Sequence, residues 1–297
     1  MIPPETSNGA QMVGMKKSRS RAIPFLVLVV ILLGVAVHQL RGNGDPADGD
    51  FTVLTQNIGD LCGCSTFDAI LENFRKLPHT DILMLQEVKN KKRVSRIADS
   101  LGYPHHAFAG YGGHRNDGMA ILSDHPLVDP RPLLLPASQD QQRCLLARVS
   151  IRGREVLAGS VHFRNIGAFP VKACTHTAST ERVVETLWRE TFFETPRSVS
   201  ARDLVSAIES AHAERVVLGG DFNTVISSRA IRTMAGYFKD SLWPSLEYLR
   251  PSYKKFSFPV GPRVDYVFYA GSLECLGSRI IPETAGDHYP VTAVFRF

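Results

Sequence analysis

The chain has 297 residues, of which 44% are hydrophobic, and its 34 Lys and Arg residues against 29 Asp and Glu residues give a net charge of +5. This composition provides enough apolar side chains for a packed core in one large domain or two. The small charge excess excludes any argument for nucleic-acid binding from total charge, because such proteins bind through local basic patches. The five cysteines include no CxxC pair and no zinc-like spacing.

The N-terminal region predicts a membrane anchor. Residues 1–21 form a tail that ends in KKSRSR, and residues 22–40 are an uncharged, apolar run close in length to the roughly 20 residues that cross a bilayer as a helix. By the positive-inside rule the basic tail stays in the cytoplasm, so we expect a single-pass protein whose remaining chain lies on the outer (periplasmic or extracellular) side. A cleaved secretion signal has the same charge-then-apolar order and is the alternative.

Residues 41–50, RGNGDPADGD, are rich in Gly, Asp and Pro and predict a flexible linker before a body of residues 51–297. The odd number of cysteines leaves at least one unpaired. An outer location permits a disulfide, and buried free thiols are the alternative.

Short apolar runs alternate with helical patterns along the body, which predicts an α/β fold. Strands are predicted over residues 51–57, 81–87, 119–123, 144–151, 155–162, 215–221, 263–269 and 291–297. Apolar residues at helical spacing predict helices over residues 67–77, 94–101 and 201–213. Ser200 with Asp203 resembles a capping box at the start of the last helix. Residues 164–196 lack a regular pattern and predict a long excursion or an inserted subdomain near the site.

The stretch VVLGGDFN, residues 216–223, predicts a buried strand that ends in functional side chains. Its two glycines let the backbone turn tightly where the strand leaves the sheet. In an extended chain alternate residues point the same way, so Asp221 and Asn223 would face one site while Phe222 points into the core. Ordinary turn residues after a strand are the alternative interpretation.

The same pattern recurs along the body, since polar side chains able to bind metal or phosphate stand at the ends of other predicted strands. These residues are Asn57, Glu87, His162, Asp265, Asp287 and His288. Strand ends that converge in a layered α/β fold are the usual place for a site, so the sequence predicts a single site built from them.

The ordered set TQN, LQEV, GMAILS, VHF, GDFN, VDYVF and GDHYPV resembles the endonuclease/exonuclease/phosphatase superfamily, the fold of DNase I. This superfamily also includes exonuclease III type abasic endonucleases, neutral sphingomyelinases and inositol polyphosphate 5-phosphatases. The resemblance covers residues 51–297. It implies a two-sheet β-sandwich flanked by helices, with one active site at the rim of the sheets, and a divalent-metal-dependent phosphoester hydrolase.

For the metal, the resemblance implies that Glu87 is the main ligand, supported by Asn57 and with Asp287 nearby. The expected ion is Mg²⁺, which prefers carboxylate oxygen and retained waters, with Mn²⁺ as the alternative.

For catalysis, the resemblance implies that Asp221 orients and deprotonates the attacking water while Asn223 holds a phosphate oxygen. Asp265 would fix the tautomer of His288, which faces the phosphoryl oxygens. His162 stands where a phosphate-contacting or acid residue is expected. Positive charge and amide donors suit the oxyanions that develop when water attacks an anionic phosphorus, and no protein nucleophile is needed.

Four further residues are candidates for contact with substrate phosphates: Asn165, Lys91, Lys92 and Arg93. Asn165 follows His162 by three residues. The others lie in KNKKR, residues 89–93, directly after Glu87, where a solvated helix start is the alternative.

The expected substrate is a phosphodiester, with nucleic acid favoured over lipid. Exonuclease III type enzymes usually carry an acid at the position of Gly59, which counts against abasic-site repair. A lipid phosphodiesterase or phosphatase acting at the membrane is the alternative, since the apolar residues of 237–248 would suit contact with lipid. A non-catalytic binding protein is a minor alternative, because the site carboxylates are all retained.

Overall fold

The computed structural model describes residues 49–59, 66–112, 115–135, 143–164, 180–254, 262–282 and 285–297. The predicted tail, membrane span and most of the linker, residues 1–48, lie outside these ranges, so the predictions for them remain untested. Within the described ranges, no helix combines the length and apolarity needed to cross a membrane.

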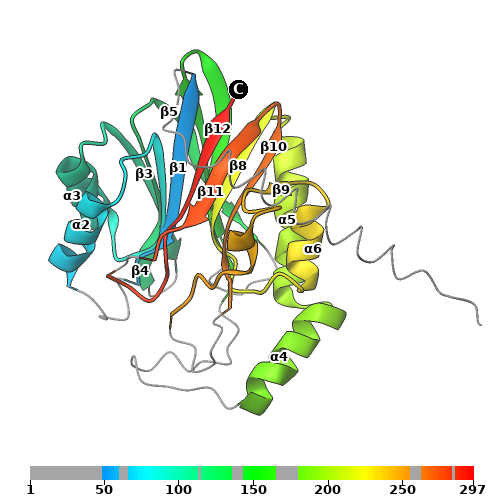
Figure 1. Cartoon of the computed structure of the whole chain (residues 1–297). Coiled ribbons are helices and arrows are strands. Elements are labelled where there is room, and N and C mark those ends of the chain that lie inside the picture. Colours follow the sequence, from blue (N-terminus) through cyan, green and yellow to red (C-terminus); the bar gives the residue numbers. More distant parts are fainter. Residues whose placement is uncertain are drawn as a thin grey trace, which may run out of the picture.

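Two six-stranded sheets pack face to face (Figure 1). The first has the order β11-β12-β1-β2-β4-β3 and consists of β1 (Asp50–Asn57), β2 (Ile82–Val88), β3 (His105–Gly112), β4 (Arg115–Ser123), β11 (Glu274–Ile280) and β12 (Val291–Arg296). The second has the order β5-β6-β7-β8-β10-β9 and consists of β5 (Leu127–Leu134), β6 (Arg143–Ile151), β7 (Arg154–His162), β8 (Arg215–Asp221), β9 (Lys239–Asp240) and β10 (Asp265–Gly271).

Each sheet has a parallel pair at its centre, β1 with β2 and β7 with β8. In the first pair Asn57 is opposite Gln86, and in the second His162 is opposite Asp221. Parallel strands end at the same edge of their sheet. The register therefore brings the carboxyl ends of four strands to one rim of the sandwich.

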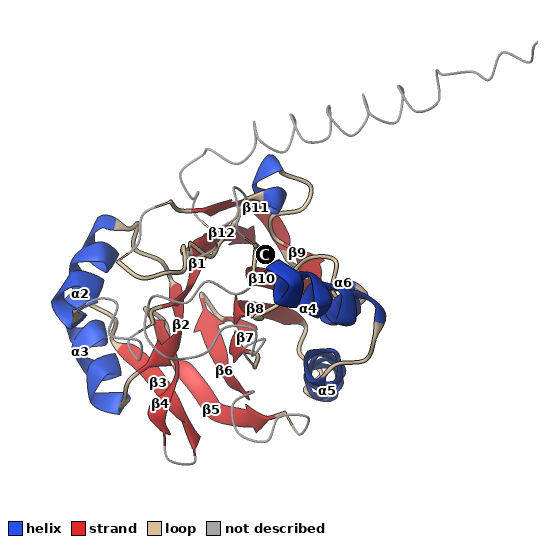
Figure 2. Ribbon diagram, turned by 90° about the horizontal axis from the view of Figure 1, so that it is seen from below, coloured by secondary structure: helices blue, strands red, loops and turns tan. Residues whose placement is uncertain are grey.

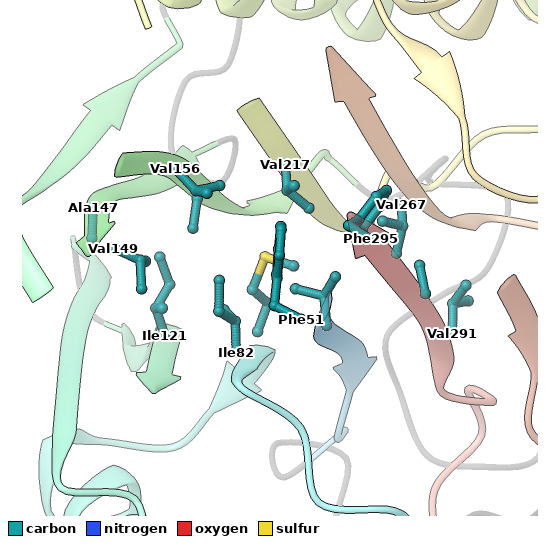
Figure 3. Close-up of a cluster of buried hydrophobic side chains, with 14 of the residues drawn as sticks. Phe51, Ile82, Ile121, Ala147, Val149, Val156, Val217, Val267, Val291 and Phe295 are labelled. Atoms are coloured by element: carbon teal, nitrogen blue, oxygen red, sulfur yellow. The ribbon is translucent and has the colours of Figure 1, made fainter. Parts of the chain in front are cut away.

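The inner faces of the sheets form the central core, and Figure 3 shows side chains that both sheets contribute to it. Phe51, Ile82 and Phe295 of the first sheet point toward Val217 and Val267 of the second, and all five are fully buried. Alternation along each strand puts these side chains inward, so their burial fixes the register on which the rim depends.

Helices cover the outer faces and complete four layers (Figure 2). The first sheet is covered by α2 (Phe67–Lys76) and α3 (Lys91–Leu101), and the second by α5 (Pro196–Ser210) and α6 (Arg229–Ala235). The helix α4 (Thr180–Phe192) and the 3₁₀ turn η1 (Leu246–Leu249) lie at the periphery. This arrangement confirms the predicted two-sheet sandwich flanked by helices.

Several sequence expectations were wrong in detail. Regular structure also occurs in β3, β5, β9, β11, α4 and α6, none of which was predicted. The helix predicted over residues 201–213 begins earlier, at Pro196, and its capping box consists of Thr195 and Ser198 rather than Ser200 and Asp203. Proline suits the first turn of a helix because its missing N–H would have no partner there.

The glycines of VVLGGDFN do not serve a turn. Gly219 and Gly220 both lie within β8, and neither has a positive φ. A Cβ on Gly220 would stand 1.9 Å from the carbonyl oxygen of Val161 on β7, and one on Gly219 would stand 2.5 Å from Cε of Met84 on the facing sheet. Close approach of neighbouring backbone and side chains, and not backbone freedom, is what requires glycine there.

Candidate active site

Asp221 lies at the centre of the rim and is 1% exposed. Its Oδ2 accepts hydrogen bonds from the side-chain amides of Asn57 and Asn223, both at 3.1 Å, and its Oδ1 accepts the backbone N–H of Asn223 at 2.8 Å. The amide oxygen of Asn57 accepts the N–H of Gly59, so its amide nitrogen faces the carboxylates. Phe222 is fully buried, as alternation along the strand predicts.

Asn223 departs from the extended chain assumed from the sequence, because its φ is +50°. This left-handed conformation is uncommon outside glycine, although asparagine adopts it more readily than most residues. It lets the side-chain amide of Asn223 reach both Asp221 and the carbonyl oxygen of Phe163, at 2.9 Å.

Two histidines stand beside Asp221. The Nε2 atoms of His162 and His288 each lie 3.7 Å from Oδ2 of Asp221. His162 comes from the end of β7, and His288 comes from the segment before β12. Segments from both sheets therefore meet at one carboxylate oxygen.

Asp265 orients His288 from behind. The Nδ1 of His288 lies 2.9 Å from Oδ2 of Asp265, which is fully buried at the start of β10. Antiparallel pairing of β10 with β8 puts Asp265 opposite Asp221. The hydroxyl oxygen of Ser252 accepts the N–H groups of Val264 and Asp265, both at 2.9 Å, and so fixes the backbone that carries the carboxylate.

Glu87 faces the same site from β2. Its φ of +56° coincides with an irregularity in the pairing of β2 with β4 between Leu85 and Val88. Its Oε1 lies 3.7 Å from Nε2 of His162, and its side chain is 26% exposed. Strained backbone at a bulge is common where a strand re-aims a functional side chain.

Burial and charge shift the pKa values of these groups. Burial raises the pKa of Asp221, and the Asp265 carboxylate adds to the rise. Burial also raises the pKa of Glu87, with Asp287 and Asp117 adding to it. Burial alone would lower the pKa of His288, but Asp265 and Asp221 outweigh it and raise this pKa to about 10. His288 is thus a cation at neutral pH, beside a carboxylate whose proton affinity is increased.

The donors present fit a hard divalent cation. Asp221, Asp265 and His288 each offer a ligand atom, and these atoms lie within 4.8 Å of one another. In this group Nδ1 of His288 is already hydrogen-bonded to Asp265, and both carboxylates are buried. The side chain of Glu87 is partly exposed, so its carboxylate is more accessible to a cation from solvent. A cation beside Glu87 would offset both the burial and the repulsion by Asp287 and Asp117 that raise the pKa of this carboxyl. Carboxylate oxygen is the ligand that Mg²⁺ prefers.

The remaining predicted site residues are Asp287 and the candidate phosphate contacts. Asp287 precedes His288, and its backbone oxygen accepts the N–H of Lys254 at 2.8 Å. Lys91 and Lys92 are exposed at the start of α3, whereas the guanidinium of Arg93 lies 4.0 Å from the ring centroid of Phe67. Asn165 lies outside the described residues. The phosphate contacts predicted for these side chains remain predictions.

The structure adds a polar link between the sheets directly beneath the site. Gln86 of β2 is fully buried and donates to the hydroxyls of Ser160, at 2.9 Å, and Thr55, at 3.1 Å. The Ser160 hydroxyl in turn donates to the carbonyl of Leu85 at 3.0 Å. Sequence reasoning missed this link, although a Gln in an otherwise apolar strand before Glu87 was a visible signal.

A buried ion pair ties α4 and α5 to the site. Glu190 and Arg197 are 3% and 7% exposed, and Nε of Arg197 donates to Glu190 at 3.0 Å. Arg197 also donates to the carbonyl of Arg164 at 2.9 Å, and the hydroxyl of Thr224 donates to Glu190 at 3.4 Å. Because Arg164 and Thr224 lie beside His162 and Asn223 in the chain, the pair braces both site segments.

Comparison with known proteins gives a consistent result. The model of the Endonuclease/Exonuclease/phosphatase family matches residues 54–288. No curated protein matches. A structure of D. rerio TDP2 complexed with single strand DNA product has a TM-score of 0.63 at 14% identity, covering 84% of this chain and 100% of that one.

Two further solved structures are similar. The mannosyl-6-phosphatase of Bacteroides thetaiotaomicron has a TM-score of 0.60 at 16% identity, covering 83% of this chain and 100% of that one. An endonuclease/exonuclease/phosphatase from Beutenbergia cavernae has a TM-score of 0.62 at 19% identity, covering 84% and 72%. At these identities the likeness shows the fold, while function has to be argued from the site.

Proposed function

Since the chain belongs to the endonuclease/exonuclease/phosphatase family, we propose that it is a divalent-metal-dependent phosphodiesterase of the nuclease type. The observation that carries this proposal is the position of Asp221, a buried carboxylate with one oxygen 3.7 Å from each of two imidazoles. A proton acceptor between two donors is what an attack by water on a phosphodiester requires.

In the proposed reaction Asp221 accepts a proton from a water molecule whose oxygen attacks phosphorus. Burial raises the pKa of this carboxyl, and so makes it a better base than an exposed aspartate. The ester oxygen then leaves and takes its proton from solvent. His288, held as a cation by Asp265, faces the charge that builds on the phosphoryl oxygens. The amide of Asn223 already donates to Asp221 and to the carbonyl of Phe163, so in this structure it orients the base, and holding a phosphate oxygen would require it to exchange one of these bonds.

We place the metal at Glu87, with Asn57 and Asp287 beside it. When bound, Mg²⁺ supplies positive charge to a phosphoryl oxygen and helps to orient the ester. Mn²⁺ has similar ligand preferences and is the alternative. The side-chain amide of Asn57 is hydrogen-bonded to both Asp221 and Glu87, and so holds these two carboxylates at a fixed separation.

The place where the chain enters the domain favours a substrate away from the membrane. β1 spans eight residues from Asp50 to the site residue Asn57, and the seven steps between these two residues cover about 23 Å at the rise of an extended strand. A predicted anchor joined through residues 41–49 would therefore attach at the edge opposite the site. In this proposal the body lies on the outer side of the membrane, and nucleic acid or another soluble phosphodiester reaches the site from solution.

A lipid phosphodiesterase is the second candidate, and exposed apolar residues favour it. Val184, Trp188 and Phe192 recur every four residues along α4 and are 60%, 58% and 58% exposed. Residues at this spacing share one helix face. The Glu190–Arg197 pair joins α4 to the site segments, so a lipid surface on this face would lie near the reacting groups.

The test uses the full-length chain with Mg²⁺ or EDTA and five substrates: plasmid DNA, RNA, sphingomyelin vesicles, phosphoinositide vesicles and bis-p-nitrophenyl phosphate. Nicking of DNA or cleavage of RNA that needs both Mg²⁺ and Asp221 supports the proposal. Asp124→Asn is the matched control, because Asp124 pairs with His79 at the opposite edge of the sheet. Turnover of lipid alone transfers the proposal to the second candidate, and inertness on all five favours a binding protein.

A further inference from the structure

Tyr111 contacts the site from β3, a strand that contributes none of the residues discussed above as catalytic. Its ring is 2% exposed and belongs to the core between the sheets. Its hydroxyl reaches the rim, where it lies 2.5 Å from Nδ1 of His162 and 3.2 Å from the backbone nitrogen of Glu87. It therefore contacts one residue from each sheet at the point where the two site halves meet.

The direction of these hydrogen bonds follows from what each group can do. The backbone N–H of Glu87 is a donor only, so the hydroxyl oxygen must accept it. The hydroxyl proton is then directed at Nδ1 of His162. If Nδ1 carried a proton instead, it and the N–H of Glu87 would both donate to the Tyr111 hydroxyl. The proton of this buried hydroxyl would then lose Nδ1 as its acceptor, which costs free energy. Burial and the Glu87 carboxylate raise the pKa of Tyr111 well above its ordinary value, so the hydroxyl keeps its proton.

An imidazole that accepts at Nδ1 carries its proton on Nε2. The Nε2 of His162 is the atom that faces Asp221 and Glu87, each at 3.7 Å. The two histidines of the site are thus held in different ways. His288 has a carboxylate behind it, which favours the cation, whereas His162 has a neutral hydroxyl donor behind it.

We propose that Tyr111 is a positioning residue, whose hydroxyl fixes His162 in the tautomer that presents Nε2–H to the substrate phosphate. This inference rests on the proposed function for its catalytic part, while the tautomer itself is a property of the folded chain. In this tautomer His162 donates a hydrogen bond to a phosphoryl oxygen. In the other tautomer it would present a lone pair to an anion, which repels it.

The first experiment measures the ¹⁵N chemical shifts of the His162 ring in the full-length chain, with His162→Gln used to assign the signals. The expected spectrum shows Nε2 protonated and Nδ1 unprotonated. Tyr111→Phe keeps the ring in the core and removes only the hydroxyl, and it should convert this spectrum to a mixture of tautomers. A proton on Nδ1 of the wild type, or an unchanged spectrum in Tyr111→Phe, overturns the proposal whatever the enzyme hydrolyses.

The second experiment measures steady-state kinetics on whichever phosphodiester the wild type hydrolyses. Tyr111→Phe should lower kcat by about 10-fold or more with a smaller change in KM, since general acid–base and donor groups contribute about 10²- to 10⁴-fold in all. In a His162→Gln background the same change should have no further effect, because Tyr111 acts through His162. Additive losses would overturn the coupling.

Tyr103→Phe is the matched control. Tyr103 is also a buried tyrosine, and its hydroxyl lies 3.2 Å from that of Thr80, before the start of β2 and so at the edge opposite Glu87. This variant also loses one buried hydroxyl, so it should change stability without changing kcat or the His162 spectrum. A wild type inert on every phosphoester would remove the proposed function and leave the tautomer to be decided by the first experiment.

Discussion

Asp265 and His288 are joined by a hydrogen bond of 2.9 Å between Oδ2 and Nδ1, and this bond leaves Nε2 of His288 directed at Asp221. The pair sets the charge of the site. With the carboxylates of Asp265 and Asp221 nearby, the pKa of His288 rises to about 10, against an ordinary value near 6.5.

Asp265→Asn should move the alkaline limit of activity to lower pH. The imidazolium is the form present below the pKa, so in the wild type it persists until the pH rises through about 10. Without the Asp265 charge the pKa falls toward about 6.5 or below, and activity should decline as the pH rises past neutrality. Profiles of kcat/KM between about pH 5 and 10 check this, and superimposable profiles would contradict the role of Asp265.

Asp221→Asn should remove activity without removing stability. Loss of the proton acceptor is expected to lower kcat by about 10²- to 10⁴-fold. The amide matches the carboxylate in shape and removes a buried charge that already has a raised pKa. This gain is offset because the NH2 group replaces an oxygen that accepts hydrogen bonds from Asn57 or Asn223. Thermal unfolding should therefore show a Tm close to that of the wild type. A clearly lower Tm would mean that the carboxylate is needed for folding, and the activity loss would then not identify a base.

Glu87→Gln should abolish Mg²⁺ binding. A ligand present at about 100 times its Kd stabilises the folded state by about 2.7 kcal/mol, so Mg²⁺ should raise the Tm of the wild type and leave that of the variant unchanged. Glu72→Gln, on the exposed face of α2, is the control. If Glu87→Gln still binds Mg²⁺ and His288→Gln does not, the ion sits in the group formed by Asp221, Asp265 and His288.

Gly219→Ala should destabilise the fold by about 1–3 kcal/mol, the usual range for overpacking, because its Cβ would meet the flexible end of Met84. Gly220→Ala should cost more, since its Cβ would meet the carbonyl of Val161, which belongs to the parallel pair that aligns His162 with Asp221. Gly110→Ala, where a Cβ approaches nothing closer than 3.7 Å, is the control. Urea unfolding measures all three, and equal midpoints would contradict the packing argument.

The sequence predicts the central strands that carry the site better than the edge strands and the peripheral helices. Strands β1, β2, β7 and β8 are apolar runs that end in polar residues. For each of them the predicted limits lie within about one residue of the limits in the structure. Convergence of the ends follows from the parallel pairing of central strands, which α/β alternation favours. This is why the sequence alone places Asn57, Asp221 and His162 together.

The strands that were not predicted lack a regular apolar pattern, and each has a physical reason for this. β5 contains Pro130 and Pro132 and is largely exposed, which only an edge strand tolerates. β3, HHAFAGYG, is interrupted by glycines, and without that strand Tyr111 could not be placed beside His162.

Helix α4 lacks the usual amphipathic pattern for a different reason. It buries Glu190 and exposes Trp188, so the inward face of the helix carries a charge and the outward face is apolar. This reverses the periodicity that a sequence search looks for. The charge is satisfied by Arg197, a residue of the next helix, and no local pattern reveals that partner.

The first and last strands of the domain are neighbours, with Asp50 opposite Arg296 in the register of β1 and β12. The side-chain amide of Gln56, one residue before Asn57, donates to the carbonyl of His288 at 3.3 Å. While a ribosome still holds the segment that becomes β12, β1 lacks this neighbour and His288 cannot take its place beside Asp221. The topology therefore delays assembly of the site until translation has passed the last strand, so a nascent chain holds these side chains apart.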